Sequence, residues 1–222
     1  MTSFLSRRAG ALLFITALVP LSAAAQRSGS TIGAGQIFAA LALKEGLTAC
    51  EIGAGDAELT IAAARIVGPG GHVYTSELGD DRVKSLRQKV AASGLTHITV
   101  VAGDPLQTNF PDGRCDALFM RNVYHHFTDP AAMNASILAA LTPGGRVAIV
   151  DFTPPGKEAD RPADRDTDGM HGISPDTLAR EIKDAGFEPE PSQHGTQRWF
   201  MIVGSKPVRE CEDLAMRRPA VR

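Results

Sequence analysis

The stretch that most constrains the fold is residues 48–53, an apolar run that ends in Glu-Ile-Gly and continues through Ala54 and Gly55 into an amphipathic run. The apolar run predicts a buried strand, and residues 57–67 predict a helix. Glycines are needed between the two because the turn is tight and the backbone must approach a ligand closely, with helix N–H groups pointing into the gap. This order of strand, glycine turn and helix predicts a doubly wound α/β domain.

Strand-like and helix-like segments alternate along the rest of the chain, which predicts a parallel sheet with helices on both faces. The expected strands are short and mostly apolar, as strands buried on both faces are; they cover residues 48–53, 72–77, 98–102, 117–121, 146–151, 187–189 and 198–205. The expected helices cover residues 57–67, 80–93, 130–141 and 174–185. Ser174 is the N-cap of the last of these helices and Gly186 is its C-cap.

The first residues predict an export signal. Arg7 and Arg8 precede an apolar run over residues 9–19, and a run of alanines ends at Ala25. This is the pattern of a cleaved signal peptide, and the apolar run is short for a permanent membrane helix. We therefore expect cleavage after Ala25 and an exported, periplasmic protein with no stable membrane association. The alternatives are an uncleaved N-terminal anchor and a cytoplasmic enzyme whose start codon is assigned too far upstream.

The domain boundaries follow from these segments. A chain of 222 residues has room for one domain with a full core once the signal is set aside. We expect a signal peptide over residues 1–25, a flexible spacer over 26–35, one domain over 36–205 and a disordered tail over 206–222. A long loop over residues 153–172, rich in Pro, Asp and Gly, is expected to be a lid or a substrate-binding segment.

Composition limits the class of partner. The chain is 43% hydrophobic and 22% charged with a formal net charge of -2, as is usual for soluble globular proteins. Lys and Arg are interleaved with Asp and Glu, so no basic patch favours nucleic acid. We expect a small-molecule partner; the oligomeric state does not follow from the sequence.

The three cysteines do not identify a compartment. Cys50 and Cys115 lie in apolar strand-like runs, and Cys211 lies in the polar tail. An odd count without short spacing supports neither a disulfide framework nor a metal knuckle. We expect two core residues and one free surface thiol.

Acidic residues follow three neighbouring strands at the edge where open α/β sheets bind ligands. Glu51 and Glu77 lie at the ends of the first and second strands, and Asp104 follows the third. An acid at the position of Glu77 holds ribose hydroxyls in such folds. Three carboxyl groups at one edge suit a nucleoside that carries positive charge.

The first turn of the helix disfavours a dinucleotide. A dinucleotide fingerprint needs its third glycine at the position of Glu58, for close packing of helix on strand. Asp56 and Glu58 would also repel phosphate groups from the helix N-terminus. We therefore expect a ligand without phosphates rather than the cofactor of a nicotinamide-dependent oxidoreductase.

The ordered set of motifs resembles class I S-adenosylmethionine-dependent methyltransferases over residues 36–205. The resemblance is carried by the Glu-Ile-Gly-Ala-Gly turn, Glu77, Gly103-Asp104, residues 117–127, and Leu141-Thr142-Pro143-Gly144-Gly145 before a strand. It implies a Rossmann-like sheet of seven strands, mostly parallel with the last strand antiparallel, and S-adenosyl-L-methionine as cofactor. The loop Tyr124-His125-His126-Phe127 further resembles a subgroup of small bacterial methyltransferases with poorly defined substrates.

The resemblance also implies roles for individual residues. Gly53 and Gly55 would line the methionine part of the cofactor, Glu77 would hold the ribose hydroxyls, and Asp104 would accept a hydrogen bond from the adenine amino group. Ala57 stands where many members have a third glycine, which is a mild departure. The expected cofactor-binding set is Glu51, Gly53, Gly55, Glu77, Asp104 and Arg121.

Methyl transfer from a sulfonium is an in-line displacement, so alignment in a dry pocket can supply most of the catalysis. A base is needed only if the acceptor is protonated. The candidates for catalysis are His125, His126 and His171, each of which could instead form hydrogen bonds that shape a loop. Adjacent histidines in an extended loop cannot easily both face one pocket, so one of the pair is expected to serve structure.

Other polar residues near these histidines have two interpretations each. Tyr124 could position an acceptor or pack at the sheet edge, and packing is favoured. Asp151 could contact substrate or cap its loop. Together with the histidines Asp151 could bind a metal, but no ligand spacing of a known metal motif is present, so we expect no metal.

The sequence therefore predicts an enzyme that transfers a methyl group from S-adenosyl-L-methionine to O, N or C of a small molecule. The alternative is a non-catalytic protein that binds the nucleoside, because an exported methyltransferase would need its cofactor outside the cytoplasm. The acceptor is not predicted, since the loops over residues 121–129 and 153–172 shape its pocket.

Overall fold

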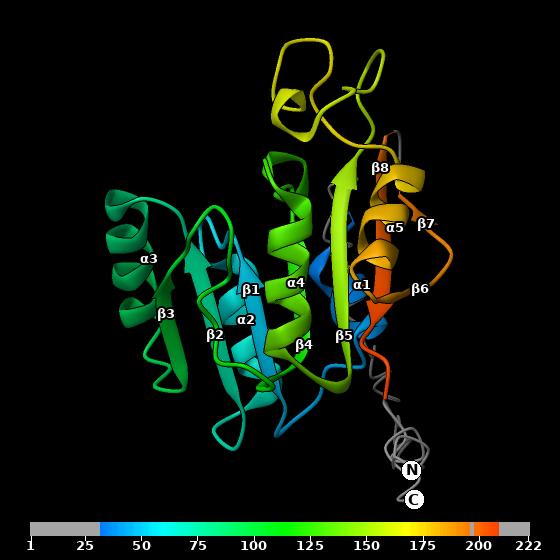
Figure 1. The fold of residues 1–222 in the computed structure, drawn as a ribbon. Helices are drawn as coiled ribbons and strands as arrows, with labels where there is room; N and C mark the ends of the chain where they lie inside the picture. Colours follow the sequence, from blue (N-terminus) through cyan, green and yellow to red (C-terminus); the bar gives the residue numbers. More distant parts are fainter. Residues whose placement is uncertain (1–31, 196–197, 209–222) are drawn as a thin grey trace, which may run out of the picture.

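The computed structural model describes residues 32–195 and 198–208, shown in colour in Figure 1. The predicted signal segment, its cleavage site, Cys211 and most of the predicted tail lie outside these residues. Strands and helices alternate along the described chain in the predicted order. None of the helices within the described ranges is long and apolar enough to cross a membrane.

The first half of the domain holds a short helix, two strand–helix repeats and a third strand. Its elements are α1 (Ala34–Ala40), β1 (Thr48–Ile52), α2 (Glu58–Val67), β2 (His72–Glu77), α3 (Asp80–Ala92) and β3 (Ile98–Ala102). The second half holds three longer strands, two strands of two residues each and two single 3-10 turns. Its elements are β4 (Cys115–Arg121), η1 (Tyr124–His126), α4 (Pro130–Ala140), β5 (Leu141–Phe152), η2 (Pro162–Asp164), α5 (Pro175–Asp184), β6 (Glu188–Pro189), β7 (Gln193–His194) and β8 (Trp199–Ser205).

The strands form one sheet in the order β3-β2-β1-β4-β5-β8-β6, and the short β7 also pairs with β8. Strands β1 to β5 pair in parallel, whereas β8 runs antiparallel to β5. The predicted Rossmann-like seven-stranded sheet, mostly parallel with an antiparallel last strand, is confirmed. The chain enters the sheet at β1 and extends first to one side and then, from β4, to the other. The carboxyl ends of β1 and β4 therefore flank the switch point, where doubly wound sheets bind ligands.

Helices cover both faces of the sheet (Figure 1). On one face α1 and α2 bury Ile37 and Leu59 against Phe119 of β4. On the other face α4 and α5 bury Ile137 and Ile182 in a second apolar cluster. This two-sided burial explains why the central strands are mostly apolar.

Cys50 and Cys115 form a disulfide between β1 and β4, with Cα atoms 5.8 Å apart. Both residues are fully buried in the core, as predicted. The expectation that no disulfide is present was wrong. The pairing was missed because the cysteines lie 65 residues apart in sequence, and only the strand order brings β1 and β4 side by side.

The folded domain extends past its predicted bounds at both ends. Helix α1 begins inside the stretch predicted as a spacer, and Ile32 ahead of it is buried. The glycines of that stretch are poor helix formers, so the sequence did not predict a helix there. At the start of the helix the Gly33 N–H donates a hydrogen bond to the side chain of Gln36 (3.1 Å). At the other end the Lys206 N–H donates to the Gly145 carbonyl (2.9 Å).

Candidate functional site

A cavity of about 840 Å³ lies at the carboxyl ends of β1, β2 and β4, within the size range of small-molecule sites. Its walls include the turn after β1, the segment after β3, η1 and two residues of η2. The cavity brings together every residue of the predicted cofactor-binding set: Glu51, Gly53, Gly55, Glu77, Asp104 and Arg121. Two of the predicted catalytic residues, His125 and His126, also line it.

The turn after β1 leaves no room for a side chain at Gly53. This glycine has a φ of +73°, and a Cβ atom there would lie 2.5 Å from Cγ2 of Val123. Gly55 also has a positive φ, but a Cβ atom there would meet open space. Ala57, at the N-cap of α2, has a φ of 62° and is a left-handed non-glycine residue. The predicted need for glycine in this turn is therefore borne out at Gly53, where backbone and neighbour both require it.

Glu51 is buried at the floor of the cavity and accepts a hydrogen bond from the Thr60 hydroxyl. Burial raises the pKa of this carboxyl group to about 7, although the Thr60 hydrogen bond and the charge of Arg121 partly oppose the shift. Such a group loses its proton readily when a cation binds nearby.

Backbone N–H groups orient the other two acids. One oxygen of Glu77 accepts from the Gly55 N–H (2.9 Å) and the other from the Leu78 N–H (3.1 Å). The Glu77 side chain is 11% exposed, so it faces the cavity rather than bulk water. Asp104 accepts from the Leu106 N–H (2.8 Å). The carboxyl groups are thus held at fixed positions along the same wall.

The acids at the start of α2 are paired with cations. Asp56 contacts the Lys89 ammonium at 2.5 Å, which lowers the pKa of Asp56 through the hydrogen bond and the nearby charge. Glu58 pairs with Arg121 at 2.9 Å. Asp56 and Glu58 would therefore repel phosphate groups less than predicted from their charges alone. Arg121, predicted to bind cofactor, lines the cavity but directs its guanidinium to Glu58.

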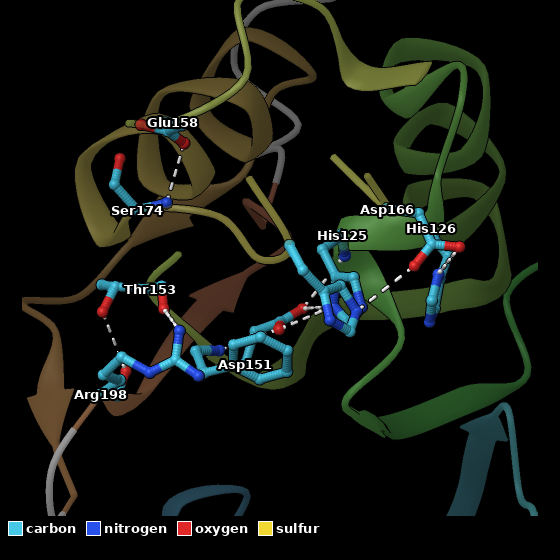
Figure 2. Close-up of polar contacts among 10 residues, drawn as sticks. His125, His126, Asp151, Thr153, Glu158, Asp166, Ser174 and Arg198 are labelled. Carbon is cyan, nitrogen blue, oxygen red and sulfur yellow. Dashed lines mark hydrogen bonds and ion pairs between the residues drawn. The ribbon is translucent and has the colours of Figure 1, made fainter. Parts of the chain in front are cut away.

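His125 is fully buried and held by Asp151, which is also fully buried. Nδ1 of His125 lies 2.9 and 3.1 Å from the two carboxyl oxygens of Asp151 (Figure 2), and the backbone N–H of His125 donates to the same group (3.1 Å). Because carboxyl oxygens accept, Nδ1 is the donor, so Nε2 of the neutral ring is an acceptor. Nε2 of His125 lies 2.8 Å from Nε2 of His171. Asp151 is therefore a positioning residue for His125.

The expectation of an extended loop around His125 and His126 was wrong. Residues 124–126 form the 3-10 helix η1, and both histidines line the cavity with ring centroids 4.0 Å apart. Burial, and then the neighbouring His125, lower the pKa of His126. Nδ1 of His126 lies 3.5 Å from Asp166, a residue that sequence reasoning missed. Asp166 reads as one of many acids in a polar loop, and no local pattern marks it.

The loop over residues 153–172 stands above the carboxyl end of β5 (Figure 1) and is tied to the domain by a buried ion pair. Arg165 is 3% exposed and pairs with Glu181 of α5 through both terminal nitrogens. The Tyr124 hydroxyl donates to the same carboxyl group (3.1 Å) and accepts from the Asn134 amide (2.8 Å). Tyr124 is fully buried, which supports the packing role favoured for it.

Further contacts anchor both ends of the long loop (Figure 2). The Arg198 guanidinium donates to the Thr153 carbonyl (2.7 Å), where the loop leaves β5. The Glu158 carboxyl group accepts from the Ser174 N–H (2.8 Å), where α5 begins. These contacts hold Asp166 and His171 against η1.

Residues 50–149 match the family model described as a methyltransferase domain. Over these residues the chain is similar to methyltransferases. The matched residues hold the strands from the second half of β1 to most of β5, and with them the glycine turn, the three acids and η1. The match ends before Asp151, so the long loop and α5 lie outside it.

Curated relatives are methyltransferases of quinone biosynthesis. The ubiquinone/menaquinone biosynthesis C-methyltransferase UbiE of Saccharophagus degradans is 31% identical over 114 residues, which are 51% of this chain and 46% of that enzyme. The enzyme of the same name from Shewanella halifaxensis is 25% identical over 170 residues, which are 65% of this chain and 68% of that enzyme. The chain spans about half the length of most curated relatives that it matches.

Solved structures agree with the fold. A SAM dependent methyltransferase from Aquifex aeolicus superposes with a TM-score of 0.69 at 20% identity, covering 80% of this chain and 91% of that one. Similarity at this identity shows the class I methyltransferase fold. Taken with the domain match, these relatives support an enzyme that uses S-adenosylmethionine and do not favour the non-catalytic alternative.

Proposed function

We propose that this protein transfers a methyl group from S-adenosyl-L-methionine to O, N or C of a small molecule. The observation that carries the proposal is the cavity at the switch point of a methyltransferase domain, walled by a glycine turn and by acids from three successive strands.

The cavity wall fits the proposed cofactor. The turn at Gly53 brings backbone close to the cavity where a Cβ atom would clash, and Gly55 leaves open space beside it. Carboxyl groups suit a cationic nucleoside, and the partly protonated Glu51 at the floor can ionise in response to its charge.

The residues of the wall would divide the cofactor among them. Gly53 and Gly55 would lie against its methionine part, Glu77 would accept from the ribose hydroxyls, and Asp104 would accept from the adenine amino group. Glu51 and Arg121 would lie beneath the methionine part of the cofactor, which carries its charged groups. When bound, S-adenosylmethionine supplies an electrophilic methyl group.

The protein's contribution to the transfer is alignment and exclusion of water. In the displacement the bond from sulfur to the methyl carbon breaks as the bond to the acceptor forms, and the acceptor loses a proton if it carried one. Residues Pro162 and Ala163 of η2 close the cavity beside η1, so the long loop shields the reacting atoms. The candidate bases His125, His126 and His171 lie together at this end, and Asp151 fixes the ring of His125.

The test is calorimetric titration of the full chain with S-adenosylhomocysteine. Glu77→Ala and Asp104→Ala should each weaken binding by about 10- to 100-fold, because each removes a hydrogen bond to an ionisable group. Glu188→Ala, at an exposed acid of the far strand β6, is the matched control and should bind like the parent. No binding by the folded parent, or equal binding by all variants, would overturn the proposal.

We also propose that the protein is exported. The signal-like N-terminus and the buried disulfide between Cys50 and Cys115 support this, because disulfides persist in oxidising compartments. Cell fractionation followed by sequencing of the mature N-terminus tests it. A chain that starts at Gln26 in the periplasm supports export, and an intact Met1 in the cytoplasm contradicts it.

A further inference from the structure

Three histidines and one aspartate converge where the long loop meets η1. His125 and His126 come from η1, and Asp166 and His171 come from the loop. Each offers one ligand atom, and these four atoms all lie within 4.8 Å of one another. We propose that His125, His126, His171 and Asp166 bind a divalent transition-metal ion at the edge of the cavity.

Two of the six distances between the ligand atoms are close to those of a tetrahedral site, and all six are within 4.8 Å. Bonds of about 2.0–2.1 Å separate any two ligands of a tetrahedral ion by about 3.3 Å. Nε2 of His171 lies 3.3 Å from Asp166, and Nδ1 of His126 lies 3.5 Å from the same carboxyl group. The two Nε2 atoms of His125 and His171 lie 2.8 Å apart, so an ion between them requires an outward shift of a few tenths of an ångström. His171 is half-exposed and free to make it.

The support behind His125 is that of a metal ligand. A ligating imidazole commonly donates its other N–H to a carboxyl group, which fixes the tautomer and the direction of the lone pair. Asp151 does this here, since both of its oxygens lie within 3.1 Å of Nδ1. Asp151 is itself held by the Phe152 N–H (2.9 Å). The lone pair of Nε2 therefore faces His171, whose Nε2 lies 2.8 Å away, before any ion binds.

The loop that supplies the other half of the site is fixed independently. Arg165, next to Asp166, is buried and paired with Glu181. The Gly172 N–H, next to His171, donates to the Arg165 carbonyl (3.1 Å). Asp166 and His171 are thus set by backbone that is anchored on α5, and Figure 2 shows Asp166 turned toward His126.

The donor set selects the class of ion. Three imidazole nitrogens and one carboxyl oxygen suit Zn²⁺ and its neighbours Co²⁺, Ni²⁺ and Fe²⁺, whereas Mg²⁺ and Ca²⁺ prefer oxygen ligands throughout. Three of the four residues, His125, His126 and Asp166, also line the cavity. An ion held there could take an oxygen of the methyl acceptor as a fifth ligand and lower the pKa of its hydroxyl.

The metal site stands on this geometry alone, while its use in the reaction rests on the proposed function. That use would make the acceptor a molecule with a hydroxyl or another oxygen ligand near the atom that receives the methyl group.

The experiment is a titration of the chelator-treated full chain with Co²⁺, followed by visible absorption and calorimetry. We expect one Co²⁺ per chain, with the intense visible bands of a four-coordinate site, and displacement by Zn²⁺. His171→Ala and Asp166→Asn should weaken binding by at least about tenfold, and Asp151→Asn by about 10- to 100-fold through its support of His125. The control is His72→Ala, because His72 lies at the opposite end of the sheet, bonded to Thr99.

Parent protein that takes up no stoichiometric Co²⁺, or His171→Ala that binds Co²⁺ as the parent does, would overturn the metal site. His171 and Asp166 are exposed loop residues, and circular dichroism verifies that their variants fold. S-adenosylhomocysteine titrations of the same samples separate the two proposals. A parent protein that binds the nucleoside but takes up no Co²⁺ overturns the metal site alone, and a parent protein that takes up Co²⁺ but does not bind the nucleoside overturns the proposed function alone.

Discussion

The two ends of the cavity are built in different ways. At the nucleoside end, beside β1 to β3, backbone N–H groups hold Glu77 and Asp104, and the turn at Gly53 follows its strand without a break. At the histidine end, side chains from η1 and the long loop meet, and one buried ion pair between Arg165 and Glu181 ties that loop down. Backbone hydrogen bonds thus support the nucleoside end, and an ion pair between distant residues supports the histidine end. We therefore expect that a substitution can disrupt one end and leave the other intact.

The largest expected effect is that of Arg165→Met at the histidine end. The substitution leaves Glu181 beside Tyr124 without its cation, which costs about 3–5 kcal/mol of unfolding free energy. Urea unfolding measures this loss, and calorimetry should show unchanged affinity for S-adenosylhomocysteine in the folded fraction. Arg161→Met, at an exposed arginine of the same loop, should change little. If Arg165→Met also weakens the binding of S-adenosylhomocysteine, the two ends of the cavity are not independent.

Glu51 should make the stability of the nucleoside end depend on pH. Its raised pKa of about 7 means that the folded protein keeps a proton that the unfolded chain releases near pH 4.5. The unfolding free energy contributed by this group therefore falls as pH rises from about 4.5 to 7, by about 3 kcal/mol in total. Glu51→Gln should remove this fall and exceed the parent in stability above pH 7.

Urea unfolding at a series of pH values measures the effect of Glu51→Gln. Glu188→Gln, at an exposed acid, should follow the parent at every pH. Parallel curves for the parent and Glu51→Gln would contradict the raised pKa.

Gly53→Ala tests how tightly the glycine turn is constrained. The added Cβ would crowd Val123 and occupy a left-handed backbone, which together cost about 2 kcal/mol of unfolding free energy. Affinity for S-adenosylhomocysteine should fall about tenfold or more as the turn shifts. Gly46→Ala has a similar φ of +83° with open space around it, so it isolates the backbone cost. If the two variants lose equal stability, contact with Val123 contributes nothing.

The smallest expected effect is that of Ala57→Gly. Glycine removes a left-handed cost of about 1–2 kcal/mol, but it also removes a buried methyl group worth about 0.8 kcal/mol and makes the unfolded chain more flexible. The sum is within about 1 kcal/mol of zero, and nucleoside affinity should not change. Thermal unfolding and calorimetry check both values. A large gain in stability would show that the left-handed Ala57 strains the turn.

The nucleoside end could be predicted from the sequence because each of its parts is encoded locally. Glu51 and the glycines are consecutive with a strand, and Glu77 ends the next strand, so the topology alone brings them to one edge. The roles of these residues in binding cofactor stay predictions until the titrations are made.

The histidine end could be predicted only in part. His125, His126 and His171 stand out by residue type, but their convergence depends on the path of the long loop, which the pairing of Arg165 with Glu181 determines. Those two residues and Asp166 look like ordinary surface charges in the sequence, because nothing local distinguishes a buried arginine from an exposed one. The disulfide was missed for the same reason, since strand order rather than spacing brings its cysteines together.

That disulfide also limits when the chain can respond to its surroundings. Cys50 and Cys115 are fully enclosed by the core, so neither oxidants nor small thiols reach the sulfur atoms of the folded protein. The bridge must form while the strands β1 and β4 are still accessible during folding. The redox state of this disulfide therefore reflects the compartment in which the chain folded. It does not reflect the compartment in which the folded protein later acts.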